Sequence, residues 1–184
     1  MGRDGFRVIG RRHIASAAFL DVERLHLAGP NGEGLDRVVI RHPGAVALVP
    51  VRGDEVLLIR QYRAAVDRWL LEVPAGKLDV PGEAPELTAH RELREEMGYR
   101  AEHLELLTTF FSTPGFSDER MYVYVATGLV AVPAEPHGIE EESADQVAVP
   151  VTELVTILRS GAIEDAKTVA ALSLYDATRA VSPG

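Results

Sequence analysis

Two apolar runs near the middle of the chain, residues 45–51 and 55–60, are separated by only Arg52, Gly53 and Asp54. Apolar runs joined by a short turn that contains Gly are typical of a hairpin of two buried strands. A buried strand pair has two apolar faces, so other parts of the chain must cover both of them. This feature favours a sheet that is enclosed between two further layers.

The rest of the chain supplies more strands and the covering helices. Alternating patterns predict two paired strands on either side of a Gly29-Pro30-Asn31-Gly32 turn, at 15–28 and 36–42. Short apolar or alternating runs predict further strands at 69–73, 101–111, 120–125 and 146–149. Helical spacing predicts helices at 84–97, 152–159 and 165–180, with a polar loop at 131–145.

Strands and helices are interspersed, and the two long helices suit opposite faces of a sheet. We therefore expect the α/β class, an α/β/α sandwich around a mixed β-sheet with an N-terminal antiparallel strand extension. We expect the extension to comprise residues 1–43 and the main domain residues 44–184.

The composition excludes several classes of partner and of chemistry. A formal charge of −9 would repel a phosphate backbone, so we expect no nucleic-acid partner. The chain has no Cys, which excludes thiolate chemistry and suits a reducing cytoplasm. No apolar run approaches the roughly 18 residues of a membrane span, so we expect no membrane partner and a cytoplasmic location.

The predicted helix at 84–97 carries three carboxylates, Glu92, Glu95 and Glu96, on one face. Such a cluster on a surface helix is usually a solvated acidic face. Like charges at this spacing destabilise a helix, and a bound cation would relieve the repulsion. Carboxylate oxygens without Cys or His favour Mg²⁺, with Mn²⁺ as the alternative, and Mg²⁺ commonly binds together with substrate phosphates.

The residues around this helix resemble a known family. From Glu83 to Tyr99 the chain matches E-x7-R-E-U-x-E-E-x-G-U, where U is a bulky apolar residue, and Gly76 precedes it. This is similar to the box of the Nudix hydrolases. Six residues separate Gly76 from Glu83 where the family has five, and the extra residue lies in the loop before the helix.

The resemblance implies a role for each matching residue. Glu92 and Glu96, assisted by Glu95, would bind the metal ions, and the carbonyl group of Ala75 would add a ligand. Structural support of the box would come from four residues: Gly76, Glu83, Arg91 and Gly98. In the family the Glu at position 83 pairs with the Arg at position 91, although Arg91 could instead form an ordinary helical pair with Glu95.

Flanking motifs are similar to those of the ADP-ribose pyrophosphatase branch. They are Arg60-Gln61-Tyr62-Arg63, the segment from Trp69 to Gly76, and Pro114, which lies fifteen residues beyond Tyr99. By this resemblance substrate would contact five residues: Arg60, Arg63, Glu72, Pro114 and Gly115. Arg63 could instead pair with Asp67 or Glu72.

The acidic loop at 137–145 resembles the loop that carries the general base in this branch. Glu142 is the best match, followed by Glu141 and then Glu140, and His137 is expected to be structural. The catalytic set implied by the resemblance is therefore Glu142, Glu141, Glu96 and Glu95.

The expected activity is Mg²⁺-dependent hydrolysis of ADP-ribose, a nucleoside diphosphate-sugar, to AMP and ribose 5-phosphate. Another nucleoside diphosphate substrate, such as a GDP-sugar or a flavin or nicotinamide dinucleotide, stays open, as does a non-catalytic ligand sensor. Family resemblance also implies a homodimer with swapped N-terminal strands. Candidates for stacking on adenine are Phe19, Tyr62 and Phe116.

Overall fold

The computed structural model describes residues 5–135 and 138–181, without the side chains of Glu140 and Glu141. Two compact units are present. One combines the residues up to Gly44 with Phe111–Arg120, and the other combines Ala45–Phe110 with the residues from Met121 onward. No helix among the described residues is long and apolar enough to span a bilayer.

The first unit is an antiparallel sheet of β1 (Arg7–Ala17), β2 (Leu20–Ala28) and β3 (Gly34–Arg41), in that order. The prediction of one strand over 15–28 is wrong, because the chain reverses at Ala18, whose φ is 50°. An Ala in the left-handed region gives no sequence signal for a turn, whereas Gly or Asn would. Among the described hydrophobic side chains of these strands, only that of Leu25 is buried.

The loop at 112–119 belongs to the same unit and is fastened to the end of β3. The backbone N–H of Ile40 donates to the carbonyl oxygen of Phe116 at 2.7 Å. The carboxylate of Asp118 accepts hydrogen bonds from the His42 backbone N–H and the Arg41 guanidinium, each at 2.9 Å.

The second unit is built on a seven-stranded sheet. Its central path has the order β10-β5-β4-β9-β8, namely β10 (Asp145–Pro150), β5 (Glu55–Arg63), β4 (Ala45–Arg52), β9 (Arg120–Ala131) and β8 (Tyr99–Phe111). Two short strands complete it, β6 (Arg68–Glu72) beside β5 and β7 (Ala75–Lys77) beside β4. Because β4 is parallel to β9 and antiparallel to β5, the sheet is mixed, as predicted.

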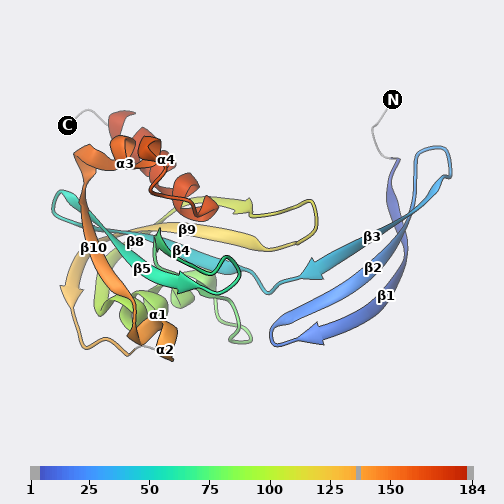
Figure 1. Ribbon diagram of the computed structural model, residues 1–184, viewed down its shortest axis with the longest axis horizontal. Coiled ribbons are helices and arrows are strands. Elements are labelled where there is room, and N and C mark those ends of the chain that lie inside the picture. The colour runs from blue at the N-terminus through green and yellow to red at the C-terminus, as the bar shows by residue number, and fades with distance from the viewer. Residues whose placement is uncertain (1–4, 136–137, 182–184) are drawn as a thin grey trace. The chain divides into compact units, whose positions relative to one another are not determined.

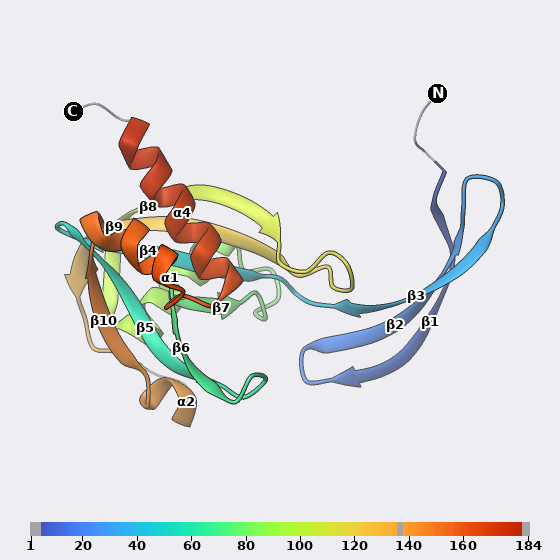
Figure 2. The same cartoon turned by 45° about the horizontal axis from the view of Figure 1, so that its top comes forward.

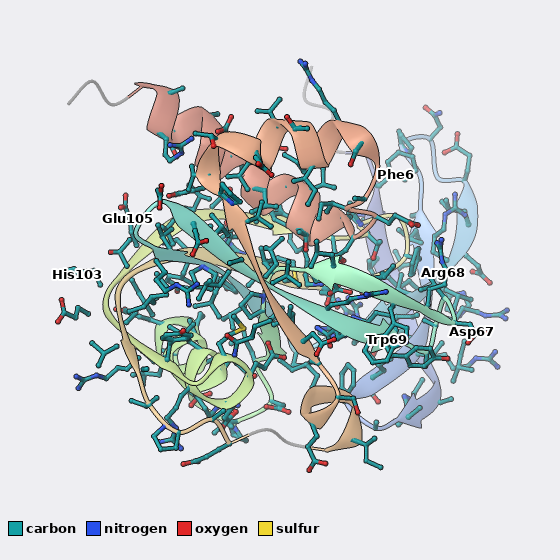
Figure 3. The ribbon with its side chains drawn as sticks, turned by 60° about the vertical axis from the view of Figure 1, so that its left-hand side comes forward. Phe6, Asp67, Arg68, Trp69, His103 and Glu105 are labelled. Atoms are coloured by element: carbon teal, nitrogen blue, oxygen red, sulfur yellow. The ribbon has the colours of Figure 1, made fainter. Side chains whose placement is uncertain are left out.

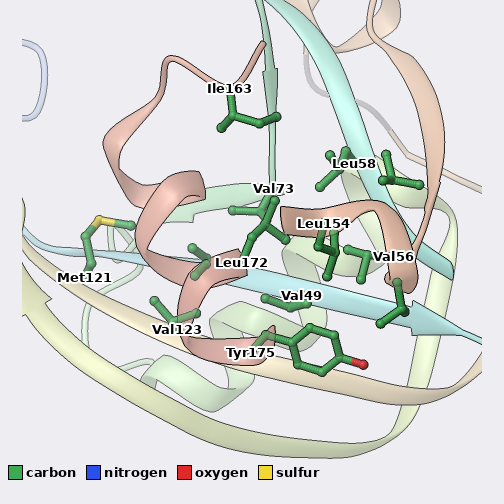
Figure 4. Close-up of a cluster of buried hydrophobic side chains, with 14 of the residues drawn as sticks. Val49, Val56, Leu58, Val73, Met121, Val123, Leu154, Ile163, Leu172 and Tyr175 are labelled. Carbon is green, nitrogen blue, oxygen red and sulfur yellow. The ribbon is translucent and has the colours of Figure 1, made fainter. Parts of the chain in front are cut away.

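Helices cover both faces of this sheet (Figure 1 and Figure 2), which confirms the predicted α/β/α sandwich. α1 (Pro85–Met97) covers one face, and α3 (Leu154–Ser160) with α4 (Ala166–Val181) covers the other. Alternate residues of β4 serve the two cores. Val46 and Leu48 pack with α1, whereas Val49 packs with Leu172 and Tyr175 of α4 (Figure 4).

The predicted helices at 84–97 and 165–180 correspond closely to α1 and α4. The predicted helix at 152–159 is split into a 3₁₀ turn (Val151–Glu153) and α3. The prediction of an uninterrupted polar loop at 131–145 is wrong at one point. This segment contains α2 (Ile139–Glu142), a helix of only four residues that is too short for a periodic pattern to reveal.

Candidate active site

The position of α1 is set at both ends by its sequence. Pro85 occupies the first turn, where its missing N–H is not needed, and Glu86 complements the positive end of the helix dipole. Gly98 ends the helix in the left-handed conformation, with φ 66°, and donates its N–H to the Arg94 carbonyl oxygen. The helix therefore stops immediately after the carboxylate cluster.

Two of the three cluster carboxylates are buried. Glu92 is 8% exposed and Glu95 is 7% exposed, while Glu96 is half-buried. Desolvating ionised carboxylates is costly unless cations or hydrogen-bond donors face them. Their burial shows that this face of α1 is not the ordinary solvated acidic face that was the alternative.

Glycine at position 76 is required by close packing. A Cβ atom at Gly76 would lie 1.9 Å from Cδ of Glu92, a distance that no side chain can occupy. Next to it, the backbone N–H of Ala75 donates to Oε2 of Glu96 at 3.1 Å. The strand β7 therefore holds two of the three carboxylates from one side.

Arg91 lies among the acidic groups from the other side. Its Nη1 donates to Glu92 at 2.8 Å and to Glu95 at 2.9 Å, and its Nη2 lies 3.3 Å from Glu83. Burial disfavours the charged guanidinium, but the contacts with these carboxylates outweigh it and raise the pKa of Arg91. Both pairings considered from the sequence, with Glu83 and with Glu95, are present together.

Glu83 connects the loop to the helix. Its carboxylate accepts a hydrogen bond from the Thr88 hydroxyl at 2.8 Å, as well as from Arg91. The Thr88 bond is the main reason that the pKa of Glu83 is lowered, and Arg91 adds to it. Glu83 is thus held ionised at the start of α1.

The donor chemistry of the site fits a hard divalent cation. Three carboxylates, those of Glu83, Glu92 and Glu95, contact a single guanidinium, and Glu96 lies on the same helix face against the Ala75 N–H. This leaves an excess of negative charge and of oxygen ligands. Within the described parts of the chain, no three acidic or His side chains are already arranged around one metal position. Arg91 contacts one oxygen of Glu92 and one oxygen of Glu95, so a cation bound to these same oxygens would compete with Arg91.

A second buried charge cluster lies at the end of the β5–β6 hairpin. Glu72 is fully buried and accepts two hydrogen bonds from Arg63, at 2.8 and 2.6 Å, and another from Lys167 of α4. Burial raises its pKa, but the two cations outweigh burial and leave the pKa of Glu72 lowered. The pairing of Arg63 with Glu72 that the sequence left open is therefore present, whereas Lys167 was not foreseen.

The remaining predicted site residues lie elsewhere. Arg60 is exposed on β5, and Glu142 is exposed at the end of α2. Pro114 and Gly115 belong to the first unit, in the loop fastened to β3. His137 and the side chains of Glu140 and Glu141 lie outside the described residues.

A cavity of about 730 Å³ opens beside the carboxylate cluster. Arg91 and Glu95 form part of its wall, and three further basic side chains of α1 and β8 line it: His90, Arg94 and Arg100. Its volume is within the range of small-molecule sites. The sequence pattern drew attention only to the acidic face of α1, so the basic residues beside it were missed.

An exposed aromatic pair is formed by Tyr62, which was among the stacking candidates, and Trp69, which was not. Trp69 is 46% exposed and packs edge-on against Tyr62, with 6.0 Å between ring centroids. Figure 3 shows Trp69 with Asp67 and Arg68 at the β5–β6 hairpin. The Tyr62 hydroxyl donates to Asp67 at 2.6 Å, so Tyr62 is partly fixed and Trp69 offers the more open ring.

Comparison with known proteins gives consistent results. The family model described as NUDIX domain matches residues 41–172. The ADP-ribose pyrophosphatase of Bacillus subtilis (strain 168) is 35% identical over 167 residues, 90% of each chain. The ADP-ribose pyrophosphatase of Mycobacterium tuberculosis (strain ATCC 25618 / H37Rv) is 40% identical over 144 residues, 78% of this chain and 69% of the other. A crystal structure titled as an ADP compounds hydrolase superposes with a TM-score of 0.86 and 28% identity, covering 97% of this chain and 96% of that one.

Proposed function

Because this chain belongs to the Nudix family and is a Nudix pyrophosphohydrolase, we propose that it hydrolyses the diphosphate linkage of ADP-ribose to AMP and ribose 5-phosphate. The observation that carries the proposal is the cluster of Glu92, Glu95 and Glu96, in which Glu92 and Glu95 are buried and Glu92 packs against Gly76. The choice of ADP-ribose is supported by two relatives that are named for that substrate.

Nudix hydrolases generally need a divalent metal, and we propose Mg²⁺, with Mn²⁺ as a substitute. Glu92, Glu95 and Glu96 would hold it, together with the Ala75 carbonyl group. The bound cation would polarise the diphosphate and the attacking water. Arg91, displaced from Glu92 and Glu95, would retain Glu83, so that the helix stays braced against its loop.

The remaining steps use side chains of this protein. Glu142 accepts the proton from the attacking water. Its side chain is exposed on α2, a four-residue helix that packs against β5. The Arg63 guanidinium, whose orientation is fixed by two hydrogen bonds to Glu72, would bind substrate oxygens. Arg60, Pro114 and Gly115 stay further proposed substrate contacts.

We also propose a homodimer with exchanged N-terminal strands and a cytoplasmic location. Among the described hydrophobic side chains of the three-stranded sheet only that of Leu25 is buried, which is too little core for the sheet to be stable by itself. Exposed Phe6, Ile9 and Val38 would be covered by a second copy.

The test is a substrate panel that compares ADP-ribose with GDP-mannose, flavin adenine dinucleotide and nicotinamide adenine dinucleotide. Each reaction is run with Mg²⁺, with Mn²⁺ and with a chelator, and products are separated by chromatography. Metal-dependent release of AMP and ribose 5-phosphate, fastest for ADP-ribose, is the expected result. Faster turnover of another compound would overturn the substrate, and absence of turnover would favour a ligand sensor.

A further inference from the structure

Gln61 of β5 carries a buried hydrogen-bond donor that is not used. The side chain is 5% exposed, and its Nε2 atom has no hydrogen-bond partner in the described part of the chain. Burying an amide N–H without an acceptor lowers stability, so folded proteins keep few such groups. A group of this kind suggests an acceptor that is reached only in another state of the protein.

A candidate acceptor is Glu96. Gln61 and Glu96 line one narrow recess together with Ile59 and Ala144. Ile59 packs in the core on the α1 side of the sheet, and Gln61, two residues further along β5, has the same orientation. An amide donor from the sheet and a carboxylate from the last turn of α1 thus face the same space.

Glu96 has the capacity for this bond. A carboxylate has about four acceptor positions, so the bond from the Ala75 N–H to Oε2 is compatible with a further donor. The fourth wall of the recess, Ala144, lies two residues after Glu142, and α2 packs against β5. A small shift of the segment that carries the proposed general base would therefore change the space between Gln61 and Glu96.

We propose that Gln61 is a positioning residue whose Nε2 donates a hydrogen bond to the Glu96 carboxylate when the enzyme binds its cation. This inference rests on the proposed function, because it gives Glu96 the role of a metal ligand. A donor on a ligand carboxylate fixes the direction in which its oxygens point, and loss of such a partner commonly weakens metal binding about 10-fold to 100-fold.

The test compares wild type with Gln61→Met, which keeps the unbranched shape and removes the donor. Mn²⁺ affinity is measured on the full chain without substrate, by electron paramagnetic resonance of the free ion. Melting temperature is measured without metal, and kcat and KM are measured with ADP-ribose. We expect Gln61→Met to bind Mn²⁺ about tenfold more weakly than wild type and to have a lower kcat with an unchanged KM. Its melting temperature without metal should be at or above that of wild type.

Gln146→Leu is the matched control. The Gln146 amide on β10 also reaches α1, but it donates to the Met97 carbonyl oxygen at 2.8 Å and not to a carboxylate. This control should lower the melting temperature and leave Mn²⁺ affinity unchanged.

Two results would overturn the inference. One is a Gln61→Met variant whose Mn²⁺ affinity equals that of wild type. The other is a Gln61→Met variant that melts well below wild type without metal or fails to fold, because the amide would then support the fold itself. If wild type neither binds Mn²⁺ nor hydrolyses any nucleoside diphosphate, the proposed function fails first, and the two failures are thereby distinguished.

Discussion

The backbone N–H of Ala75 donates a hydrogen bond to Oε2 of Glu96, 3.1 Å away and twenty-one residues later in the chain. Ala75 lies on β7 before the box loop, and Glu96 lies in the last turn of α1 after it. The bond orients Glu96, a candidate metal ligand. Because the donor is a backbone N–H, the side chain at position 75 does not contribute to this bond.

Replacing Glu96 by Gln keeps its shape and removes its charge. We expect kcat to fall about 100-fold or more, since loss of even a partner that only orients a metal ligand costs 10-fold to 100-fold. The melting temperature should change by only a few degrees. Glu86→Gln, the same charge change at an exposed position of α1, is the control, and near-normal turnover by Glu96→Gln would exclude a metal-binding role.

Glu142→Gln tests the general base. We expect kcat to fall between about 10²-fold and 10⁴-fold, because proton transfer from water would be lost. Mn²⁺ affinity without substrate should not change, because Glu142 is not among the proposed ligands. Glu141→Gln is measured in parallel, and if that variant alone loses activity, the base is Glu141 and the assignment to Glu142 is wrong.

Gly76→Ala should affect activity more than stability. The new Cβ would overlap Cδ of Glu92, and the flexible Glu92 side chain would move more readily than the backbone. We expect Mn²⁺ affinity and kcat to fall by about tenfold or more. Gly34→Ala, where a Cβ meets nothing within 4 Å, is the control. Equal Mn²⁺ affinity in the two variants would show that the Gly76 contact does not matter.

Glu72→Gln should destabilise the fold by about 1.5–3 kcal/mol, because Arg63 and Lys167 would lose a buried charged acceptor while Lys167 keeps its ion pair with Asp165. The folded pKa of Glu72 lies below its ordinary value of 4.5, so its contribution is complete above pH 4.5 and is lost as the pH falls through the folded pKa. The free energy of unfolding, measured in urea, should therefore decrease below pH 4.5 for wild type and decrease less for Glu72→Gln.

The exposed pair of Arg68 and Glu164 provides the comparison for this experiment. Glu164→Gln should change stability by less than about 1 kcal/mol. If Glu72→Gln is no more destabilising than Glu164→Gln, the buried cluster does not stabilise the fold in the way described.

Ile9→Glu tests the proposed dimer. Ile9 is 61% exposed in the single chain, so the change costs little there, but a charge in an apolar interface would be costly. Sedimentation velocity should show a dimer for wild type and a shift toward monomer for the variant. Val130→Glu, an exposed position on β9, should stay dimeric, and a monomeric wild type would disprove the proposal.

The sequence predicted those features that have local signals. Pro85 and Gly98 marked the ends of α1, and the spacing of its glutamates marked the face that the structure packs against Gly76. Signals of this kind depend on residues near one another in the chain, and they hold without knowledge of the fold.

Features that depend on tertiary contacts were missed. Lys167 reaches Glu72 across ninety-five residues, and the turn at Ala18 is imposed by strand pairing without a turn residue. Arg91 satisfies two pairings that the sequence presented as alternatives, because helix and loop meet only in the folded chain. No sequence pattern could single out Gln61, because only the folded structure shows whether its amide donor has an acceptor.

Strand β4 supplies alternate side chains to both hydrophobic cores of the second unit. Neither core can form without this strand, and the strand cannot leave one core while staying in the other. Unfolding of this unit should therefore be a single cooperative event, so that no partly unfolded species keeps α1 in place. A destabilising substitution beneath α4 would then deplete the catalytically competent population as effectively as one beneath α1.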